Sequence, residues 1–245
     1  MSVNENEWFK NWFDTAYYHI LYKKRDHSEA SLFIDELVDY LAPPKDSEFL
    51  DLACGKGRHS IYLNQKGFDV TGLDLSANSI QCAKQLESKS LRFLEHDMRI
   101  PLDNFKFDYI LNLFTSFGYF DEIADDKAVI SNVKKSLKKG GMFVLDYFNA
   151  SKPNTNFDVL FKKTIDNIDF EIIKHIKDGR IIKEITVNDS GHISKYAEQV
   201  RLYDLDQFKQ IVSDEGLTLI QTFGSYNLEP YNKTTSERLI LVVKN

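Results

Sequence analysis

Short apolar runs alternate with amphipathic stretches of helical period over the first 150 residues of this chain. The apolar runs have strand length, and the stretches between them repeat with the period of an α-helix. Such alternation is typical of a parallel sheet with helices on both faces. The pattern predicts strands at 48–53, 69–74, 91–95, 107–114 and 142–148, and helices at 58–66, 76–88 and 122–138.

The pattern changes after residue 150. Residues 158–203 lose the helical period and form apolar runs separated by KDGR and NDSG, which are typical hairpin turns. We therefore expect an inserted antiparallel β-sheet over residues 151–203. The chain then returns to a helix that begins at Asp204 or Asp206 and ends before Gly216, followed by the strands LTLIQTFG and RLILVVKN.

The N-terminal segment has a helical pattern of its own. Aromatic and aliphatic residues recur at helical spacing over residues 7–23, which predicts one amphipathic helix. Asp26 and Glu29 have capping-box spacing for a second helix through Leu41, which the two following prolines end. We expect residues 1–42 to form a helical lid.

The segment FLDLACGKGRHS at residues 49–60 is the most informative motif. It predicts a strand, a turn containing Gly55 and Gly57, and the start of a helix. Such a turn exposes backbone N–H groups to a nucleotide-like ligand. The next strand ends on Asp74, about twenty residues after the glycines, where a ribose-binding carboxylate is expected.

Asp51, Gly55, Gly57 and Asp74 together resemble the class I S-adenosylmethionine (SAM) dependent methyltransferases. The resemblance implies an α/β, Rossmann-like, seven-stranded mixed sheet whose last strand is antiparallel, built from residues 43–150 and 204–245. It implies SAM as cofactor and methyl transfer to a small-molecule acceptor by in-line displacement. The N-terminal helices and the inserted sheet resemble a bacterial small-molecule subgroup that includes glycine- and sarcosine-type N-methyltransferases.

A dinucleotide-binding domain is the main competing interpretation of the glycine turn. Its fingerprint has a third glycine or alanine, and this chain has Ser60 there. Asp51 also argues against NAD, because a carboxylate would repel pyrophosphate, whereas it would attract the amino group of SAM. The methyltransferase interpretation is favoured.

The resemblance also implies a set of cofactor contacts along the strand ends. Each has a structural alternative: Asp74 could cap the following helix, Asp97 could be a surface loop acid, and Asn112 could be an ordinary strand end. In the N-terminal helix, Tyr18, Tyr22 and Arg25 could instead belong to a packing surface. The full predicted set is Tyr18, Tyr22, Arg25, Asp51, Ala53, Gly55, Gly57, Arg58, Asp74, Leu75, Asp97, Met98, Asn112 and Phe114.

The acceptor site is less defined. The segment TSFGYF replaces the NPPY or DPPY sequence of many nucleic-acid N-methyltransferases, so that Phe117 and Tyr119 are expected near the transferring methyl. A hydrophobic lid is the alternative role. Arg201 and Tyr231 are further candidates for acceptor binding. The sequence identifies no catalytic acid or base, and orientation of an activated methyl donor needs none.

The composition of the chain limits the classes of molecule that it is expected to bind. The net charge is −6 (31 basic and 37 acidic residues) with no basic tract, so that nucleic acid and anionic membranes are not expected. A neutral or cationic small molecule fits better. The histidines show no metal spacing and the two cysteines form no CxxC unit. No signal peptide or spanning run is evident, so that the expected location is the cytoplasm. A SAM-binding module without catalysis is the functional alternative.

Overall fold

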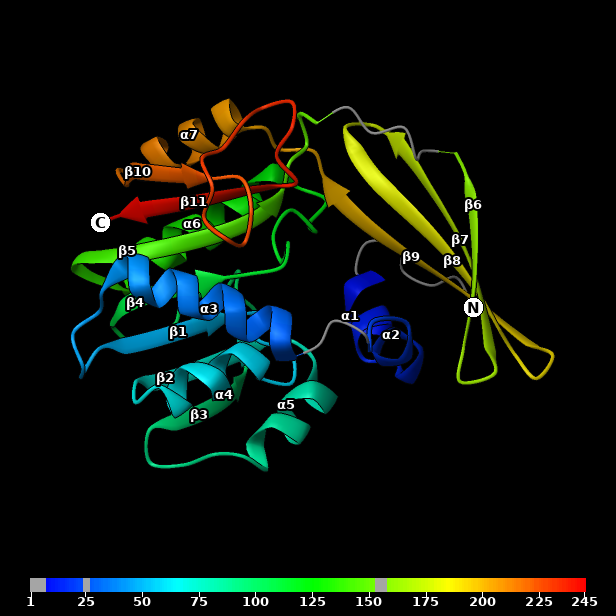
Figure 1. Cartoon of the computed structure of the whole chain (residues 1–245), viewed down its shortest axis with the longest axis horizontal. Coiled ribbons are helices and arrows are strands. Elements are labelled where there is room, and N and C mark those ends of the chain that lie inside the picture. The colour runs from blue at the N-terminus through cyan, green and yellow to red at the C-terminus, as the bar shows by residue number, and fades with distance from the viewer. Residues whose placement is uncertain (1–7, 24–26, 153–157) are drawn as a thin grey trace. The chain divides into compact units, whose positions relative to one another are not determined.

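A computed structural model of the chain describes residues 8–23, 27–152 and 158–245. The chain divides into two compact units (Figure 1). The core unit comprises His27–Phe117, Glu122–Lys152 and Tyr203–Asn245. The cap unit comprises Met1–Asp26, Gly118–Asp121 and Pro153–Leu202.

The core unit is built on a seven-stranded sheet in the order β10-β11-β5-β4-β1-β2-β3. Only β11 runs antiparallel to its neighbours, which confirms the predicted mixed sheet. Its strands are β1 (Glu48–Leu52), β2 (Asp69–Asp74), β3 (Leu91–Glu95), β4 (Phe107–Asn112), β5 (Leu137–Phe148), β10 (Thr218–Phe223) and β11 (Arg238–Lys244).

Helices cover both faces of this sheet (Figure 1). Three lie on one face: α3 (His27–Leu41), α4 (Arg58–Gln65) and α5 (Ala77–Lys84). The other face is covered by α6 (Ile123–Ser136) and α7 (Leu205–Asp214). Asp204, one of the two predicted first residues of this helix, caps α7 in a complete capping box with Gln207.

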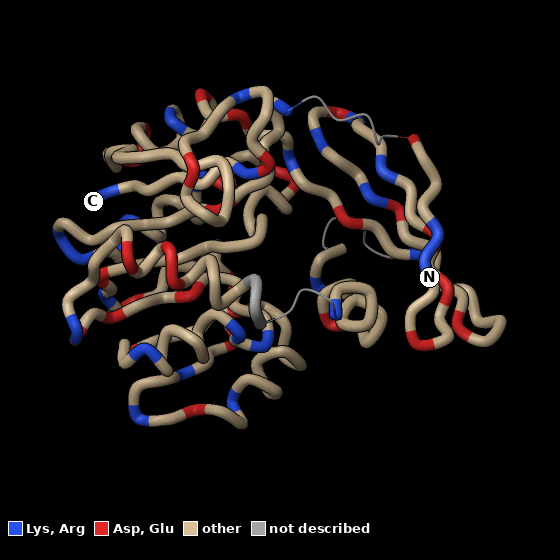
Figure 2. Tube along the Cα trace, in the orientation of Figure 1, with Lys and Arg blue, Asp and Glu red and all other residues tan. Residues whose placement is uncertain are grey.

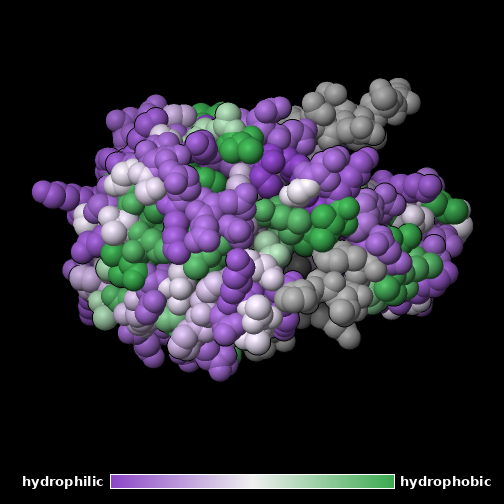
Figure 3. Space-filling view, turned by 90° about the horizontal axis from the view of Figure 1, so that it is seen from above, coloured by the Kyte–Doolittle hydropathy of each residue, from purple (hydrophilic) through white to green (hydrophobic). Residues whose placement is uncertain are grey.

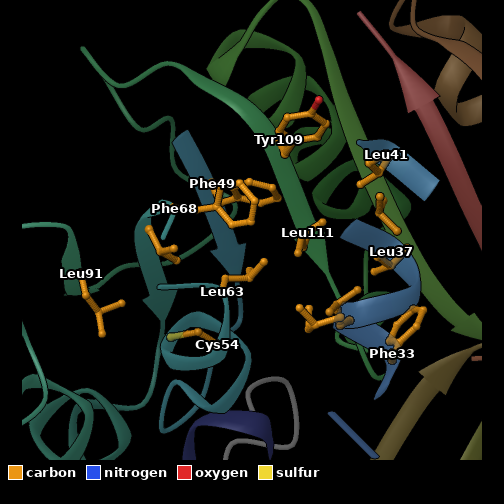
Figure 4. Packing of buried hydrophobic residues seen from close by; sticks show 14 of the residues in the cluster. Phe33, Leu37, Leu41, Phe49, Cys54, Leu63, Phe68, Leu91, Tyr109 and Leu111 are labelled. Atoms are coloured by element: carbon orange, nitrogen blue, oxygen red, sulfur yellow. The ribbon is translucent and has the colours of Figure 1, made fainter. Parts of the chain in front are cut away.

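The main core cluster lies between α3 and the strands (Figure 4). Phe33 and Leu37 of α3 are buried, as are Phe49 and Leu111 of the strands they face. Burial of these side chains supplies the main stabilising free energy of the layer. The strand ends that carry the candidate site are therefore held by a rigid, packed support.

The cap unit contains a four-stranded antiparallel sheet in the order β6-β7-β8-β9. Its strands are β6 (Leu160–Ile165), β7 (Ile168–Lys177), β8 (Arg180–Asp189) and β9 (His192–Arg201). Left-handed residues at Asp178 and Gly179, and at Ser190 and Gly191, form the two turns that the sequence predicted. Two short helices, α1 (Trp8–Phe13) and α2 (Ala16–Leu21), belong to this unit, and α1 contacts β9.

Two sequence predictions differ from the structure here. The single helix over residues 7–23 is wrong, because Thr15 interrupts it: its side chain accepts a hydrogen bond from the Tyr18 N–H and caps α2. The strand predicted to reach residue 114 ends at Asn112, because Phe114 turns into the left-handed region with φ 58°. In addition, α3 belongs to the core unit and not with the two helices before it, unlike the predicted 1–42 segment.

Charged residues of both signs are interspersed along the chain (Figure 2). Hydrophilic residues dominate the face seen in Figure 3, where hydrophobic residues form separate clusters. In the described part of the chain, no helix is long and apolar enough to cross a bilayer.

We expect Phe208→Ala to lower the free energy of unfolding by about 3–5 kcal/mol. The Phe208 ring is buried in the core unit, with ring centroids 5.0 Å from Tyr147 and 5.2 Å from Tyr203. Urea denaturation is the measurement. Ile220→Ala is the control in the same unit, because Ile220 is 49% exposed and its loss should cost far less. Equal losses in the two variants would contradict this account of the core.

Candidate functional site

The predicted core contacts gather at one edge of the sheet, where β1, β2, β3 and β4 have their carboxyl ends. Parallel pairing requires this, since the carboxyl ends of parallel strands meet at the same edge. Eight of the predicted residues directly follow these strands, and two more are the last residues of a strand. They are Ala53, Gly55, Gly57 and Arg58 after β1, Leu75 after β2, Asp97 and Met98 after β3, Phe114 after β4, and the strand-end residues Asp74 and Asn112.

The two glycines of the turn after β1 differ in what surrounds them. Both have positive φ, 57° at Gly55 and 81° at Gly57. A Cβ built on Gly57 would lie 2.5 Å from the buried Phe93 ring, whereas a Cβ built on Gly55 meets nothing within 4 Å. Gly57 is therefore required by packing inside the protein, whereas the Cβ position of Gly55 borders open space. Ala53, just before them, is also left-handed with φ 63°.

Asp74 ties the turn after β1 to the turn after β2. Its Oδ2 accepts from the Gly55 N–H at 2.7 Å and its Oδ1 accepts from the Ser76 N–H at 2.8 Å. Ser76 itself caps α5 with its hydroxyl, so the helix cap is provided by Ser76 rather than by Asp74. A carboxylate oxygen can accept more than one hydrogen bond, and Asp74 is only partly buried, so its carboxylate is of a kind that suits hydroxyl donors. Leu75 beside it is half-buried.

Asp51 is a buried carboxyl at the end of β1. Its Oδ2 accepts from the Ser60 hydroxyl of α4 at 2.6 Å, and only 1% of the residue is exposed. Burial raises the pKa of Asp51 to about 6, while the Ser60 hydrogen bond lowers it. Nearby Asp74 raises this pKa and Arg58 lowers it, so Asp51 responds to charge at the site. Ser60, which departs from the dinucleotide fingerprint, is thus the partner of Asp51.

The turn after β3 is held by its own side chains. Asp97 accepts from the Arg99 backbone N–H at 2.9 Å and from the Arg99 guanidinium, at 2.6 Å for its shortest contact. Asn132 of α6 donates to the Met98 carbonyl at 3.1 Å. These bonds hold the turn in place and give Asp97 a structural role there.

Asn112 lies fully buried at the end of β4. Its Nδ2 donates to the Leu52 carbonyl at 2.9 Å and to the Ser116 carbonyl at 3.3 Å. Its Oδ1 has no hydrogen-bond partner among the described residues. A buried acceptor without a donor is costly, so a donor at this position would be stabilised.

Phe114 joins the turn after β4 to the glycine turn. Its ring stacks on His59 at 5.1 Å between centroids, and the Arg58 guanidinium carbon lies 4.2 Å from its centroid. The Phe114 N–H donates to Asp146 Oδ2 at 2.7 Å. Sequence analysis gave no role to His59 or Asp146. An acidic residue inside the apolar strand FVLDYF was the available signal for Asp146, since unpaired buried carboxylates are rare.

Tyr18 and Tyr22, two of the predicted N-terminal contacts, belong to the cap unit. The Tyr22 hydroxyl donates to Glu198 at 2.6 Å and is paired with Lys183. Tyr18 packs on Trp12 and Tyr22, with ring centroids 5.7 Å and 5.0 Å apart. Both side chains thus make contacts within the cap unit. Arg25 lies outside the described residues.

The four predicted acceptor contacts are divided between the units. Phe117 is fully buried in the core unit, with its ring 5.9 Å from Tyr203, so its side chain is a core residue. Tyr231 also lies in the core unit and donates to Asn149 Oδ1 at 3.0 Å. In the cap unit, Tyr119 packs on Trp8 at 5.4 Å and Arg201 donates to the Asp121 carbonyl at 2.6 Å.

The chemistry available at the strand ends is binding and orientation. The edge offers a half-buried carboxylate and a buried amide acceptor. No group of three or more His, Cys, Asp or Glu residues in the described ranges has a geometry suited to a metal ion. Burial raises the pKa of Cys54 well above its usual value, so its thiol is inert rather than nucleophilic.

Known proteins share both the fold and the sequence pattern. A structure described as a SAM-dependent methyltransferase from Clostridium acetobutylicum matches with a TM-score of 0.78 and 23% identity, over 96% of this chain and 98% of that chain. A glycine/sarcosine N-methyltransferase of Aphanothece halophytica is 24% identical over 98% of this chain and 90% of its own length.

A third relative matches over a shorter span. The dTDP-3-amino-3,4,6-trideoxy-alpha-D-glucopyranose N,N-dimethyltransferase of Streptomyces venezuelae is 29% identical over 50% of this chain and 51% of its own length. The family model described as a methyltransferase domain matches residues 44–198, which is more than half of the chain. The chain therefore belongs to the methyltransferase-domain family.

Proposed function

We propose that this methyltransferase binds SAM at the carboxyl edge of its core sheet and transfers the methyl group to an amine of a small molecule. The observation that carries the proposal is the Asp74 carboxylate, bound to the Gly55 N–H at the mouth of the glycine turn. Such a carboxylate beside a glycine turn is suited to the hydroxyls of a nucleoside ribose.

The residues at the edge fit the parts of SAM. Gly55 borders open space that a ligand can enter. Asn112 Oδ1 is a buried acceptor without a partner among the described residues, and a ligand ammonium or amine would satisfy it. Asp51 adds a negative charge at the same end of β1, where the positive groups of SAM would be attracted. A pyrophosphate would be repelled there, which argues against NAD.

Bound SAM would supply an activated methyl group on a positively charged sulfur. The protein's own residues would then bind the two reactants, orient them and exclude water. Orientation alone can lower the activation barrier of such reactions by about 7–11 kcal/mol. Asp74 would hold the ribose, and Leu75 with the Asp97–Met98 turn would contact the adenine. Arg58 and Phe114 would lie toward the methionine end. Tyr18 and Tyr22 remain proposals for a cofactor lid, as do Tyr119, Arg201 and Tyr231 for the acceptor.

An amine acceptor is supported by two independent observations. The relatives from Aphanothece halophytica and Streptomyces venezuelae are named as N-methyltransferases. The net charge of −6 favours neutral or cationic acceptors over anionic ones. An amine with a free lone pair also needs no dedicated protein base.

The proposal is tested by calorimetry with S-adenosylhomocysteine, the demethylated product, and with NAD. We expect S-adenosylhomocysteine to bind and NAD not to bind. Asp74→Ala should weaken binding by roughly ten- to hundredfold with the fold intact, because hydrogen bonds to a charged carboxylate contribute about 1.5–3 kcal/mol. Binding of NAD alone would overturn the assignment. Turnover of SAM against a panel of small amines, alcohols and carboxylates then separates an enzyme from a non-catalytic module and identifies the acceptor atom.

A pair of glycine variants separates ligand contact from packing. We expect Gly55→Ala to weaken S-adenosylhomocysteine binding at a cost of only roughly 1–2 kcal/mol in stability, which is the price of a left-handed alanine. Gly57→Ala adds a clash with Phe93 and should lose about 1–3 kcal/mol more. Melting temperature and binding affinity are measured for both variants. Unchanged affinity in Gly55→Ala would mean that no ligand occupies the space beside Gly55.

The raised pKa of Asp51 predicts a pH dependence of binding. Below about pH 6 the Asp51 carboxyl is protonated in the empty protein and cannot attract the ligand ammonium. We therefore expect affinity for S-adenosylhomocysteine to be about tenfold weaker at pH 5 than at pH 7. The stability of the empty protein changes in the opposite sense. Between the usual pKa of 3.8 and about 6, Asp51 keeps its proton in the native state and loses it in the unfolded state. Raising the pH through this range therefore lowers the free energy of unfolding. Asp51→Asn should abolish both dependences.

A further inference from the structure

The turn after β4 adopts a backbone conformation that its residues do not favour. Phe114 and Thr115 have φ values of 58° and 63°, and neither is glycine. The left-handed region is unfavourable for side chains with a Cβ, and especially for a β-branched residue such as threonine. Two such residues in succession persist only where surrounding contacts hold them.

Asp146 supplies those contacts from the neighbouring strand β5. Its side chain accepts from the Phe114 N–H at 2.7 Å, and its backbone carbonyl accepts from the Thr115 N–H at 3.0 Å. The register explains the position: Asn112 of β4 is paired with Leu145 of β5, so Asp146 lies beside the chain as it leaves β4. One residue thus binds both left-handed amides.

Arg238 of β11 balances the buried charge of Asp146. Its Nε lies 2.7 Å from Asp146 Oδ1, and the same guanidinium donates to the Thr115 hydroxyl at 2.9 Å. Asp146 is fully buried, and burial raises its pKa while Arg238 lowers it. Arg238 therefore favours the charged form of Asp146 and also holds the turn through the Thr115 hydroxyl.

The conformation of the turn decides where the Phe114 ring lies. In this conformation the ring stacks on His59 and lies under the Arg58 guanidinium, both in the first turn of α4 directly after the glycine turn. Tyr226 packs on Phe114 as well, 5.1 Å between centroids, and extends its hydroxyl toward Asp146. The network thus connects β5 and β11 to the first turn of α4.

We propose that Asp146 and Arg238 are positioning residues for the methyl-transfer site, which hold Phe114 in the left-handed conformation that places its ring against Arg58 and His59. This inference rests on the proposed SAM site. It assigns a role to two residues that are not expected to touch the ligand, acting through the backbone of the turn after β4.

The test compares Asp146→Asn with Asp108→Asn in the full chain, using melting temperature and calorimetric affinity for S-adenosylhomocysteine. Asp108 is the matched control, because it also accepts from a backbone N–H, that of Glu48, and from a cation, Lys138. It lies at the opposite ends of the strands, where β1 and β4 begin. We expect both variants to melt at a lower temperature and only Asp146→Asn to lose affinity, by tenfold or more.

The double variant Asp146→Asn with Arg238→Gln separates positioning from charge balance. It removes the uncompensated cation, so we expect the melting temperature to recover while the affinity stays low. Recovery of both would show that the pair only balances charge and would overturn the proposal. Affinity of Asp146→Asn within twofold of the parent would also overturn it.

Phe114→Leu keeps the proposal testable if the charge variants do not fold. It leaves in place the Asp146 contacts with the backbone and the Arg238 contact with the Thr115 hydroxyl, and removes only the ring. We expect it to lose affinity at least tenfold with a smaller change in melting temperature. Normal affinity would overturn the proposal. If the parent protein itself does not bind S-adenosylhomocysteine, the proposed SAM site fails and not the positioning role alone.

Discussion

Phe93 makes the contact on which the geometry of the strand ends depends. Its ring is fully buried and lies where a side chain on Gly57 or on Gly72 would otherwise stand, 2.5 Å and 2.6 Å from their ideal Cβ positions. Two glycines on separate segments therefore allow one aromatic ring to fill the space between them. The turn after β1 can approach β2 and β3 only because of this packing, and Asp74 reaches the Gly55 amide as a result.

Electrostatics at this edge follow from burial. Asp51 and Asp146 are both buried carboxyls near the ends of β1 and β5, the two strands that flank β4, and burial raises the pKa of each. Their negative charges have different partners: Asp51 accepts a hydrogen bond from a neutral hydroxyl, whereas Asp146 accepts one from a positively charged guanidinium. Asp51 is thus the residue whose charge is left to be satisfied by something else, while Asp146 is already satisfied within the protein.

Much of the core could be predicted from sequence because its signals are local. The strand of apolar residues, the glycine turn and the following Asp74 occupy a short stretch, and parallel pairing places the other strand ends beside them. The break at Thr15 was missed because helical periodicity continues through it, and only the capping geometry reveals it. Asp146 and Arg238 lie on different strands and are 92 residues apart in the sequence, so no local sequence pattern could pair them.

The cap unit draws on three separate parts of the chain, one of which is only the tetrapeptide Gly118–Asp121. Arg180 and Arg201 both donate to backbone carbonyls of this tetrapeptide, while the residues just before it are held in the core unit. The cap is therefore not a removable module. An exchange of caps between relatives, whether by recombination in nature or by design, would have to carry this tetrapeptide and the N-terminal helices together with the inserted sheet, because the two arginines would otherwise lose the carbonyls to which they bind.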